Sequence, residues 1–186
     1  MGYDMTMEVS ALNEIFVEFY YWITVPLMFL IHVGFCLYEV SISRAKNHIH
    51  TLMKNAMLIP MVTITMFLFG FWIYFAGQGP FGNFVGGTTG LPWDATMGSN
   101  VKDHIMGVFW AAFLLFSWTA ASIVSGAVIE RIRTGAFLIL AVLVGSVTWM
   151  IDAAWGWSAA GWMVTDWGYH DAYASGCLLY TSDAAD

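Results

Sequence analysis

Four long apolar stretches constrain this chain more than any other feature of its sequence. A helix needs about 20 residues to cross about 30 Å of hydrocarbon at a rise of 1.5 Å per residue. Segments 15–38, 56–76, 105–129 and 135–154 have about this length, and the second and third contain no Asp, Glu, Lys or Arg. Because 59% of the 186 residues are hydrophobic and only 10% are charged, the composition excludes a soluble domain. The sequence predicts an all-α polytopic membrane protein.

The basic residues indicate how these helices are oriented. Five of the six lie between the first and second spans or between the third and fourth, and cytoplasmic loops carry the excess of Lys and Arg. We therefore expect the loops 38–55 and 130–134 to be cytoplasmic, and the N-terminus and residues 77–104 to lie outside. A cleaved signal peptide is a poor alternative, because residues 1–14 carry three carboxylates and no Lys or Arg. The basic residues of the two loops are Arg44, Lys46, Lys54, Arg131 and Arg133.

The second half of the third span carries small side chains at helical spacing. Ala121 and Ser125 are four residues apart, and so are Ser122 and Gly126. In a bilayer such a stripe lets another helix approach closely and pack by van der Waals contact. We expect this helix to be surrounded by protein. A lone helix with incidental small residues is the weaker alternative, because these residues share one stripe.

The last ten residues do not read as part of a membrane protein. Residues 177–186, C-L-L-Y-T-S-D-A-A-D, match one reading frame of a transposase-type sequencing adapter at all ten codons. An ordinary polar C-terminus is the alternative, but a coincidence of this length is far less frequent. We interpret residues 177–186 as a sequencing-adapter artefact, and residues 1–176 as a partial membrane domain whose gene continues beyond Gly176.

Three sequence blocks carry a resemblance to a known family. The first is G-F-C-L-Y-E-V-S-I-S-R-A-K-N at 34–47, followed by L-M-K-N at 52–55. The second is A-A-S-I-V-S-G-A-V-I-E-R at 120–131, and the third is G-Y-H-D-A-Y-A-S-G at 168–176. In order and spacing they resemble the segments of ammonium transporters that leave the first helix, close the third and enter the fifth. The resemblance covers essentially residues 12–176.

The family pattern is not matched everywhere, which indicates a divergent member. The departures are Val40-Ser41, Phe113-Leu114-Leu115 and Ala172-Tyr173-Ala174.

The resemblance implies the first part of an eleven-helix fold built from two inverted repeats, which assembles as a homotrimer with one pore in each subunit. It implies a channel-like transporter of ammonium or ammonia in the cell membrane, with ammonium and the lipid bilayer as partners. It implies no enzyme, cofactor, metal site or nucleic-acid partner. The paired pore histidines of the family would lie beyond Gly176, so the chain alone is expected to be inactive. Two alternatives stay open, a membrane ammonium sensor fused to a signalling domain and an Rh-type gas channel.

The resemblance also assigns substrate-binding residues. The segment W-G-W-S-A-A-G-W at 155–162 lies at the outer end of the fourth span, where the family places a tryptophan that recruits ammonium. Trp157 is the first choice, because Trp155-Gly156-Trp157 keeps the family's W-x-W spacing, and Trp155 is the second. Cation–π contact with a desolvated tryptophan contributes about 2 kcal/mol. From the residues alone, an interfacial aromatic belt is the alternative.

An aromatic gate is expected below this tryptophan. Counted back from Glu130-Arg131, Phe116 falls at the position where the family has the gate. A ring across the pore would block a chain of water and let only a partly dehydrated solute pass. The alternative is that Phe116 only packs against its neighbours.

Three charged residues are expected to act as structural support. Asp171 resembles a buried aspartate at the start of the fifth helix that shapes the recruitment site from behind, and a carboxylate there would also cap that helix. Glu39 and Arg44 lie at the inner end of the first span. We expect them to make contacts between helix ends on the cytoplasmic side, and solvated interfacial charges are the alternative.

Overall fold

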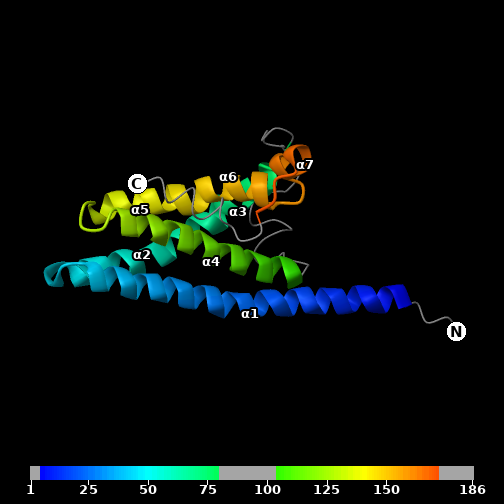
Figure 1. The fold of residues 1–186 in the computed structure, drawn as a ribbon, viewed down its shortest axis with the longest axis horizontal. Helices are drawn as coiled ribbons and strands as arrows, with labels where there is room; N and C mark the ends of the chain where they lie inside the picture. The colour runs from blue at the N-terminus through cyan, green and yellow to red at the C-terminus, as the bar shows by residue number, and fades with distance from the viewer. Residues whose placement is uncertain (1–4, 80–103, 172–186) are drawn as a thin grey trace.

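The computed structural model describes residues 5–79 and 104–171, and the described residues form helices and turns without a strand (Figure 1). This confirms the predicted all-α class. In chain order the elements are α1 (Met5–Ile42), the 3-10 turn η1 (Ala45–Asn47), α2 (His48–Thr65), the π-helical η2 (Met66–Gly70), α3 (Phe71–Ala76), α4 (His104–Ala127), α5 (Thr134–Val142), the π-helical η5 (Leu143–Thr148), α6 (Trp149–Asp152), the π-helical η6 (Ala153–Trp157) and α7 (Trp162–Trp167).

These elements combine into long rods that lie side by side (Figure 1). Rod one is α1, rod two runs from α2 through η2 to α3, rod three is α4, and rod four runs from α5 to η6. Each rod is long and apolar enough to cross a membrane, as the four predicted spans require. The qualifying segments are Leu12–Ile42, Ala45–Ala76, Gly107–Ala127 and Thr134–Trp167.

The first connection is shorter than the sequence predicts. The expected loop 38–55 is largely helical, because α1 continues to Ile42 and α2 begins at His48. Loss of hydropathy marks where side chains become polar, whereas the backbone hydrogen bonds of a helix continue past that point. The predicted turn near 130–134 lies between α4, which ends at Ala127, and α5, which begins at Thr134. Most of the expected connection 77–104 lies outside the described residues.

The bundle has two chemically different ends. We call the end that contains the turns 43–47 and 128–133 the basic end, because Arg44, Lys46, Arg131 and Arg133 gather there. We call the opposite end, which contains Trp155, Trp157 and Trp162, the aromatic end. In Figure 1 the two turns of the basic end lie together, and α7 lies at the opposite end.

Helix α4 is the most enclosed of the four rods. Its small residues Ala121, Ser122 and Ser125 are fully buried, as the stripe of small residues predicts. Helix α4 also lies close to rod four, because the Ser117 hydroxyl donates a hydrogen bond to the Gly145 carbonyl oxygen at 2.7 Å. A Cβ atom on Gly145 would lie 3.0 Å from the Ser117 carbonyl oxygen, so a larger residue would push the two helices apart.

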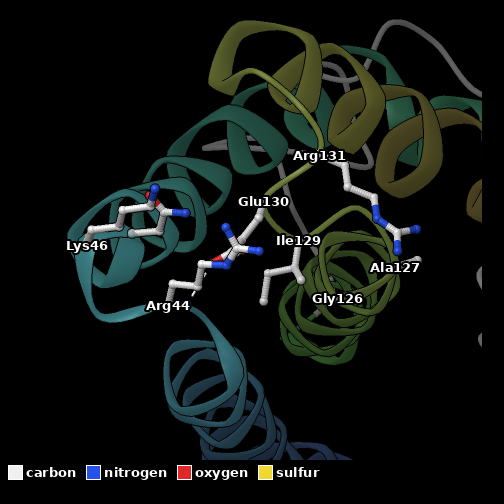
Figure 2. A pocket seen from close by; sticks show the side chains of 8 residues that line it. Arg44, Lys46, Gly126, Ala127, Ile129, Glu130 and Arg131 are labelled. Atoms are coloured by element: carbon white, nitrogen blue, oxygen red, sulfur yellow. Dashed lines mark hydrogen bonds and ion pairs between the residues drawn. The ribbon is translucent and has the colours of Figure 1, made fainter.

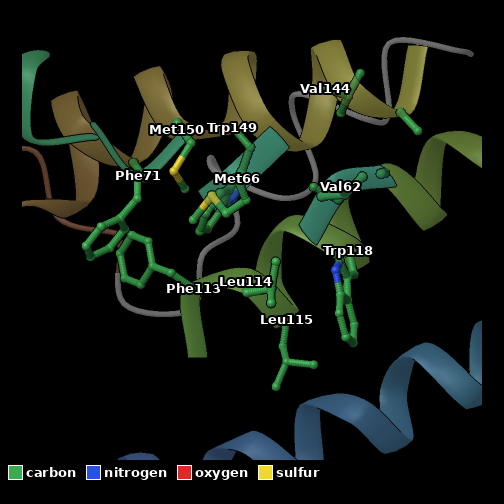
Figure 3. Packing of buried hydrophobic residues seen from close by; sticks show 14 of the residues in the cluster. Val62, Met66, Phe71, Phe113, Leu114, Leu115, Trp118, Val144, Trp149 and Met150 are labelled. Carbon is green, nitrogen blue, oxygen red and sulfur yellow. The ribbon is translucent and has the colours of Figure 1, made fainter. Parts of the chain in front are cut away.

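The apolar core lies where rods two, three and four meet (Figure 3). Val62 and Met66 come from rod two and are fully buried. Phe113 of α4 and Trp149 of α6 meet in the same core, with ring centroids 5.2 Å apart. This packing fixes α4 against rod four, the two rods that carry Phe116 and Trp157.

Candidate functional site

Four aromatic rings meet in the half of the bundle nearest the aromatic end, and we call them the aromatic site: Phe113, Phe116, Trp149 and Trp157. The ring of Trp157 meets the Phe116 ring edge to face, at 5.1 Å between centroids and 77° between planes. Trp149 lies parallel to Phe116, at 6.1 Å and 4°. Phe113 completes the group at 5.7 Å from Trp157. The structure thus places the first-choice tryptophan directly against the expected gate.

A π-helical turn brings Trp149 and Trp157 to the same side of rod four. They are eight positions apart in the sequence, which at 3.6 residues per turn of α-helix would place their side chains roughly 80° apart. The segment Ala153–Trp157 is π-helical. Its i→i+5 turns hold more residues than α turns, so each residue rotates the chain less. The two rings therefore converge, with centroids 6.5 Å apart.

Trp157 is held by a hydrogen bond. Its indole N–H donates to the backbone carbonyl oxygen of Asp171 at 3.0 Å, which ties η6 to the segment after α7. Asp171 therefore touches the expected recruiting residue through its main chain. The helix that Asp171 is expected to cap lies outside the described residues.

Trp155, the second choice, lies in a different environment. Its ring packs edge to face on Trp162 at 6.0 Å, and its indole nitrogen lies near Gly77 at the end of α3. Trp162 in turn contacts Trp167 at 4.7 Å. Trp155 and Trp162 thus belong to a separate cluster of edge-to-face rings at the aromatic end.

Sequence reasoning missed Trp149. This side chain is fully buried, yet it contacts Phe113, Phe116 and Trp157. The sequence spacing of Trp149 and Trp157 did not indicate that their rings meet, because the π-helical segment between them cannot be recognised from hydrophobic periodicity.

Glu39 belongs to a polar network buried between helices. Only 1% of Glu39 is exposed, so the alternative of a solvated charge is wrong for this residue. Its Oε2 accepts hydrogen bonds from the Ser125 hydroxyl at 2.5 Å and from Asn55 Nδ2 at 2.9 Å. The Ser122 hydroxyl donates to the other side of the Asn55 amide at 3.3 Å. The network joins α1, α2 and α4 near the basic end.

Arg44 stays exposed and joins the two turns of the basic end (Figure 2). Its backbone N–H donates to Glu130 Oε1 at 2.6 Å, and its Nε lies 3.4 Å from Glu130 Oε2. The backbone N–H of Arg44 is the main reason that the pKa of Glu130 lies below its ordinary value, and the Asn47 side chain and the Arg44 charge add to this effect. Glu130 has a φ of 60°, a left-handed conformation that is strained for this residue type.

A cavity of about 640 Å³ opens between these two turns. Figure 2 shows Glu130 facing Arg44 on one side, whereas Arg131 extends over the end of α4. Gly126 lines the cavity and also lies near the Glu39 carboxylate behind it. The basic end therefore has an open polar cavity at its surface, and the buried polar network around Glu39 lies beneath that cavity.

Comparison with known proteins identifies the family. A sequence model of the Ammonium Transporter Family matches residues 19–182. Ammonium transporter Amt2 of Haloferax mediterranei is 32% identical over 181 residues, which are 95% of this chain and 37% of that protein. The putative ammonium transporter sll1017 of Synechocystis is 30% identical over 159 residues, 83% of this chain and 34% of that protein. The ammonium transporter of Bacillus subtilis is 32% identical over 143 residues, 74% of this chain and 34% of that protein.

The chain thus spans about a third of the length of these relatives. The interpretation of residues 177–186 as an adapter sequence stays a prediction. The family match covers most of the chain, beginning within α1 and including rods two, three and four. The described part of the chain has four helices long and apolar enough to cross a membrane, so the chain is part of an integral membrane protein, and it belongs to the ammonium transporter family.

Proposed function

We propose that this chain forms the first part of an ammonium transporter and that the aromatic site receives the cation. The contact between Trp157 and Phe116 carries this proposal, because it joins a candidate receptor for a cation to a candidate gate. Two further facts support it. The relatives are named ammonium transporters, and the site lies close to the aromatic end of helices that can span a bilayer.

The ring of Trp157 would attract ammonium through its π face. Its N–H is engaged by the Asp171 carbonyl oxygen, so the ring is held in place before an ion arrives. A cation–π contact of about 2 kcal/mol corresponds to roughly 30-fold in affinity. The Phe116 ring, set edge to face on Trp157, would then prevent a hydrated ion from passing.

The complete transporter would contain segments beyond this chain. In this proposal the second inverted repeat and the pore histidines come from the rest of the gene, and the complete protein forms a homotrimer with one pore per subunit. The basic end faces the cytoplasm and the aromatic end faces outside. The five basic residues near the basic end support this orientation.

Uptake by the complete transporter tests the proposal. Cells that lack their own ammonium carriers would express it as wild type, Trp157→Leu or Trp162→Leu. We expect Trp157→Leu to raise the half-saturating ammonium concentration by roughly 30-fold, the value of one cation–π contact. Trp162→Leu should change it little, because Trp162 packs in the separate cluster with Trp155. Equal effects of the two variants would assign both residues to an aromatic belt and contradict the proposed site.

A further inference from the structure

The cavity between the two turns of the basic end carries an excess of positive charge. Its charged lining residues are three cations and one carboxylate: Arg44, Lys46, Arg131 and Glu130. Its volume of about 640 Å³ is that of a pocket for a small molecule. The cavity is therefore large enough for a ligand, and its charge favours an anion.

An acidic group of the protein itself shows how the turn 43–47 binds negative charge. The Glu130 carboxylate accepts a hydrogen bond from the Arg44 backbone N–H at 2.6 Å and another from the Asn47 side chain. Arg44 Nε lies 3.4 Å from the second oxygen of that carboxylate. Backbone N–H groups of a turn and a guanidinium are donors that bind both carboxylates and phosphates. The turn 43–47 is thus already a receptor for an acidic group.

Two cations of the cavity have no such close contact. Within the described residues, neither Lys46 nor Arg131 forms an ion pair, and Lys46 attracts Glu130 only at longer range. Figure 2 shows Lys46 and Arg131 on opposite sides of Glu130. Both side chains are exposed, so a ligand from outside the protein can reach them. Because one carboxylate compensates one of the three cations, two positive charges remain.

We propose that this cavity binds a phosphate group, with Lys46 and Arg131 as its principal partners. A phosphate group has negative charge and several acceptor oxygens, so it can contact two cations at once. Free phosphate and the headgroup of an anionic phospholipid both present this chemistry, the second at the surface of the membrane. The Glu130 carboxylate repels the ligand and so limits its affinity. This inference does not rest on the proposed transport function.

Arg133 provides a matched control for Arg131. It is an exposed arginine of the same turn, but it does not line the cavity. Basic residues also gather at the ends of membrane spans for reasons of orientation alone. A general attraction of anions to this end of the bundle would treat Arg131 and Arg133 alike, whereas a site in the cavity distinguishes them.

Thermal unfolding of the complete transporter in detergent measures the binding of inorganic phosphate, with sodium chloride at equal ionic strength as the reference. Phosphate should raise the unfolding midpoints of wild type and Arg133→Ala equally. Lys46→Ala and Arg131→Ala should each raise the dissociation constant roughly fivefold, the value of one exposed charge pair. These side chains are exposed, so the three variants should fold. Glu130→Gln should bind phosphate more tightly, because the repelling charge is removed.

A second arm distinguishes the two sources of the phosphate group. The same variants receive phosphatidylglycerol or phosphatidylcholine in the detergent solution, and their unfolding midpoints are compared. Stabilisation by phosphatidylglycerol alone, with a greater loss in Arg131→Ala than in Arg133→Ala, would identify a lipid headgroup. The same pattern with inorganic phosphate would identify free phosphate. No response in either arm, or equal losses in Arg131→Ala and Arg133→Ala, would overturn the proposal.

Discussion

Trp149 is a fully buried member of the aromatic site. It therefore does not meet the bulk solution, and it lies parallel to Phe116 while it contacts Trp157. In the complete transporter, Trp149→Phe should retain most uptake because a ring remains beside Phe116. Trp149→Leu should reduce uptake and narrow the preference for ammonium over methylammonium, because Phe116 loses its stacked partner. Uptake of both solutes, normalised to the amount of folded protein, measures this difference.

Trp118→Leu provides the control for a buried tryptophan. Trp118 lies on α4, as Phe116 does, but its indole N–H donates to Thr63 and its ring contacts His32 and Phe29. This variant should cost stability without changing the preference between the two solutes. If it changes the preference as Trp149→Leu does, Trp149 has no special relation to Phe116.

Single residues of the site were predictable to different degrees. The W-x-W spacing identified Trp157, and the structure places that side chain against Phe116. Motif order identified Glu39 but not its burial, because a glutamate near the end of a span reads as interfacial. Lys54 was visible as a basic residue of an expected loop and as part of the L-M-K-N motif, but not as a buried side chain. Its place beside Phe137 depends on how α2 packs on α5, which no local pattern encodes.

The turn between α4 and α5 holds the turn between α1 and α2 through Glu130. Because the pKa of Glu130 is lowered in the folded protein, its ionised form contributes stability above the ordinary carboxyl pKa of 4.5. That contribution is lost as the pH falls through the lowered pKa. Glu130→Gln should therefore unfold at a lower temperature than wild type at pH 7, and the difference should shrink in acid below about pH 4.5. Unfolding midpoints measured across this range check the prediction.

The left-handed backbone of Glu130 supplies a control for that experiment. Glu130→Gly removes the carboxylate but relieves the strain of a φ of 60°. It should lose the same acid dependence as Glu130→Gln while it retains more stability at pH 7. A difference from wild type that stays constant with pH in both variants would show that the carboxylate does not provide the contact.

The orientation of the rods can be tested at exposed positions in the two ends. Ser43 is buried and unsuitable for labelling, whereas Ala45 and Thr165 are exposed. In the complete transporter, with Cys36 and any other native cysteine replaced by Ser, Ala45→Cys should react with a membrane-impermeant thiol reagent only after the cells are opened. Thr165→Cys should react in intact cells. The opposite pattern would reverse the proposed topology.

Hydropathy predicted the elements better than their ends. The four spans were recognisable because lipid requires long apolar helices whose backbone groups are paired internally. The end of α1 and the start of α2 could not be recognised from hydropathy, since polar residues can continue a helix beyond the hydrocarbon. The π-helical segments η2, η5 and η6 were also unpredictable, because hydrophobic periodicity does not distinguish π turns from α turns. At Gly70, the last residue of η2, an added Cβ would lie 3.0 Å from the Ser146 carbonyl oxygen, so rods two and four pack closely there.

The four rods leave large apolar surfaces without a protein partner in the described part of the chain. Helix α1 exposes 66% of Phe16, 69% of Tyr20 and 63% of Leu30. Helix α4, in contrast, is enclosed by the other rods. Exposed apolar residues are expected where a helix faces lipid, and also where it meets further helices of a larger assembly. The relatives, about two and a half times as long, have room for such helices.

The proposal that this chain is the first part of a longer transporter predicts that residues 1–176 alone transport nothing. In a protein of inverted repeats the substrate path lies between the two repeats, so one incomplete repeat supplies only one wall. Residues 1–176 would be expressed in cells that lack ammonium carriers, beside a version completed with the downstream gene. Only the completed version should restore growth on limiting ammonium, and an immunoblot of membranes should show less of the short form. Growth supported by residues 1–176 would show that these four rods contain the whole path.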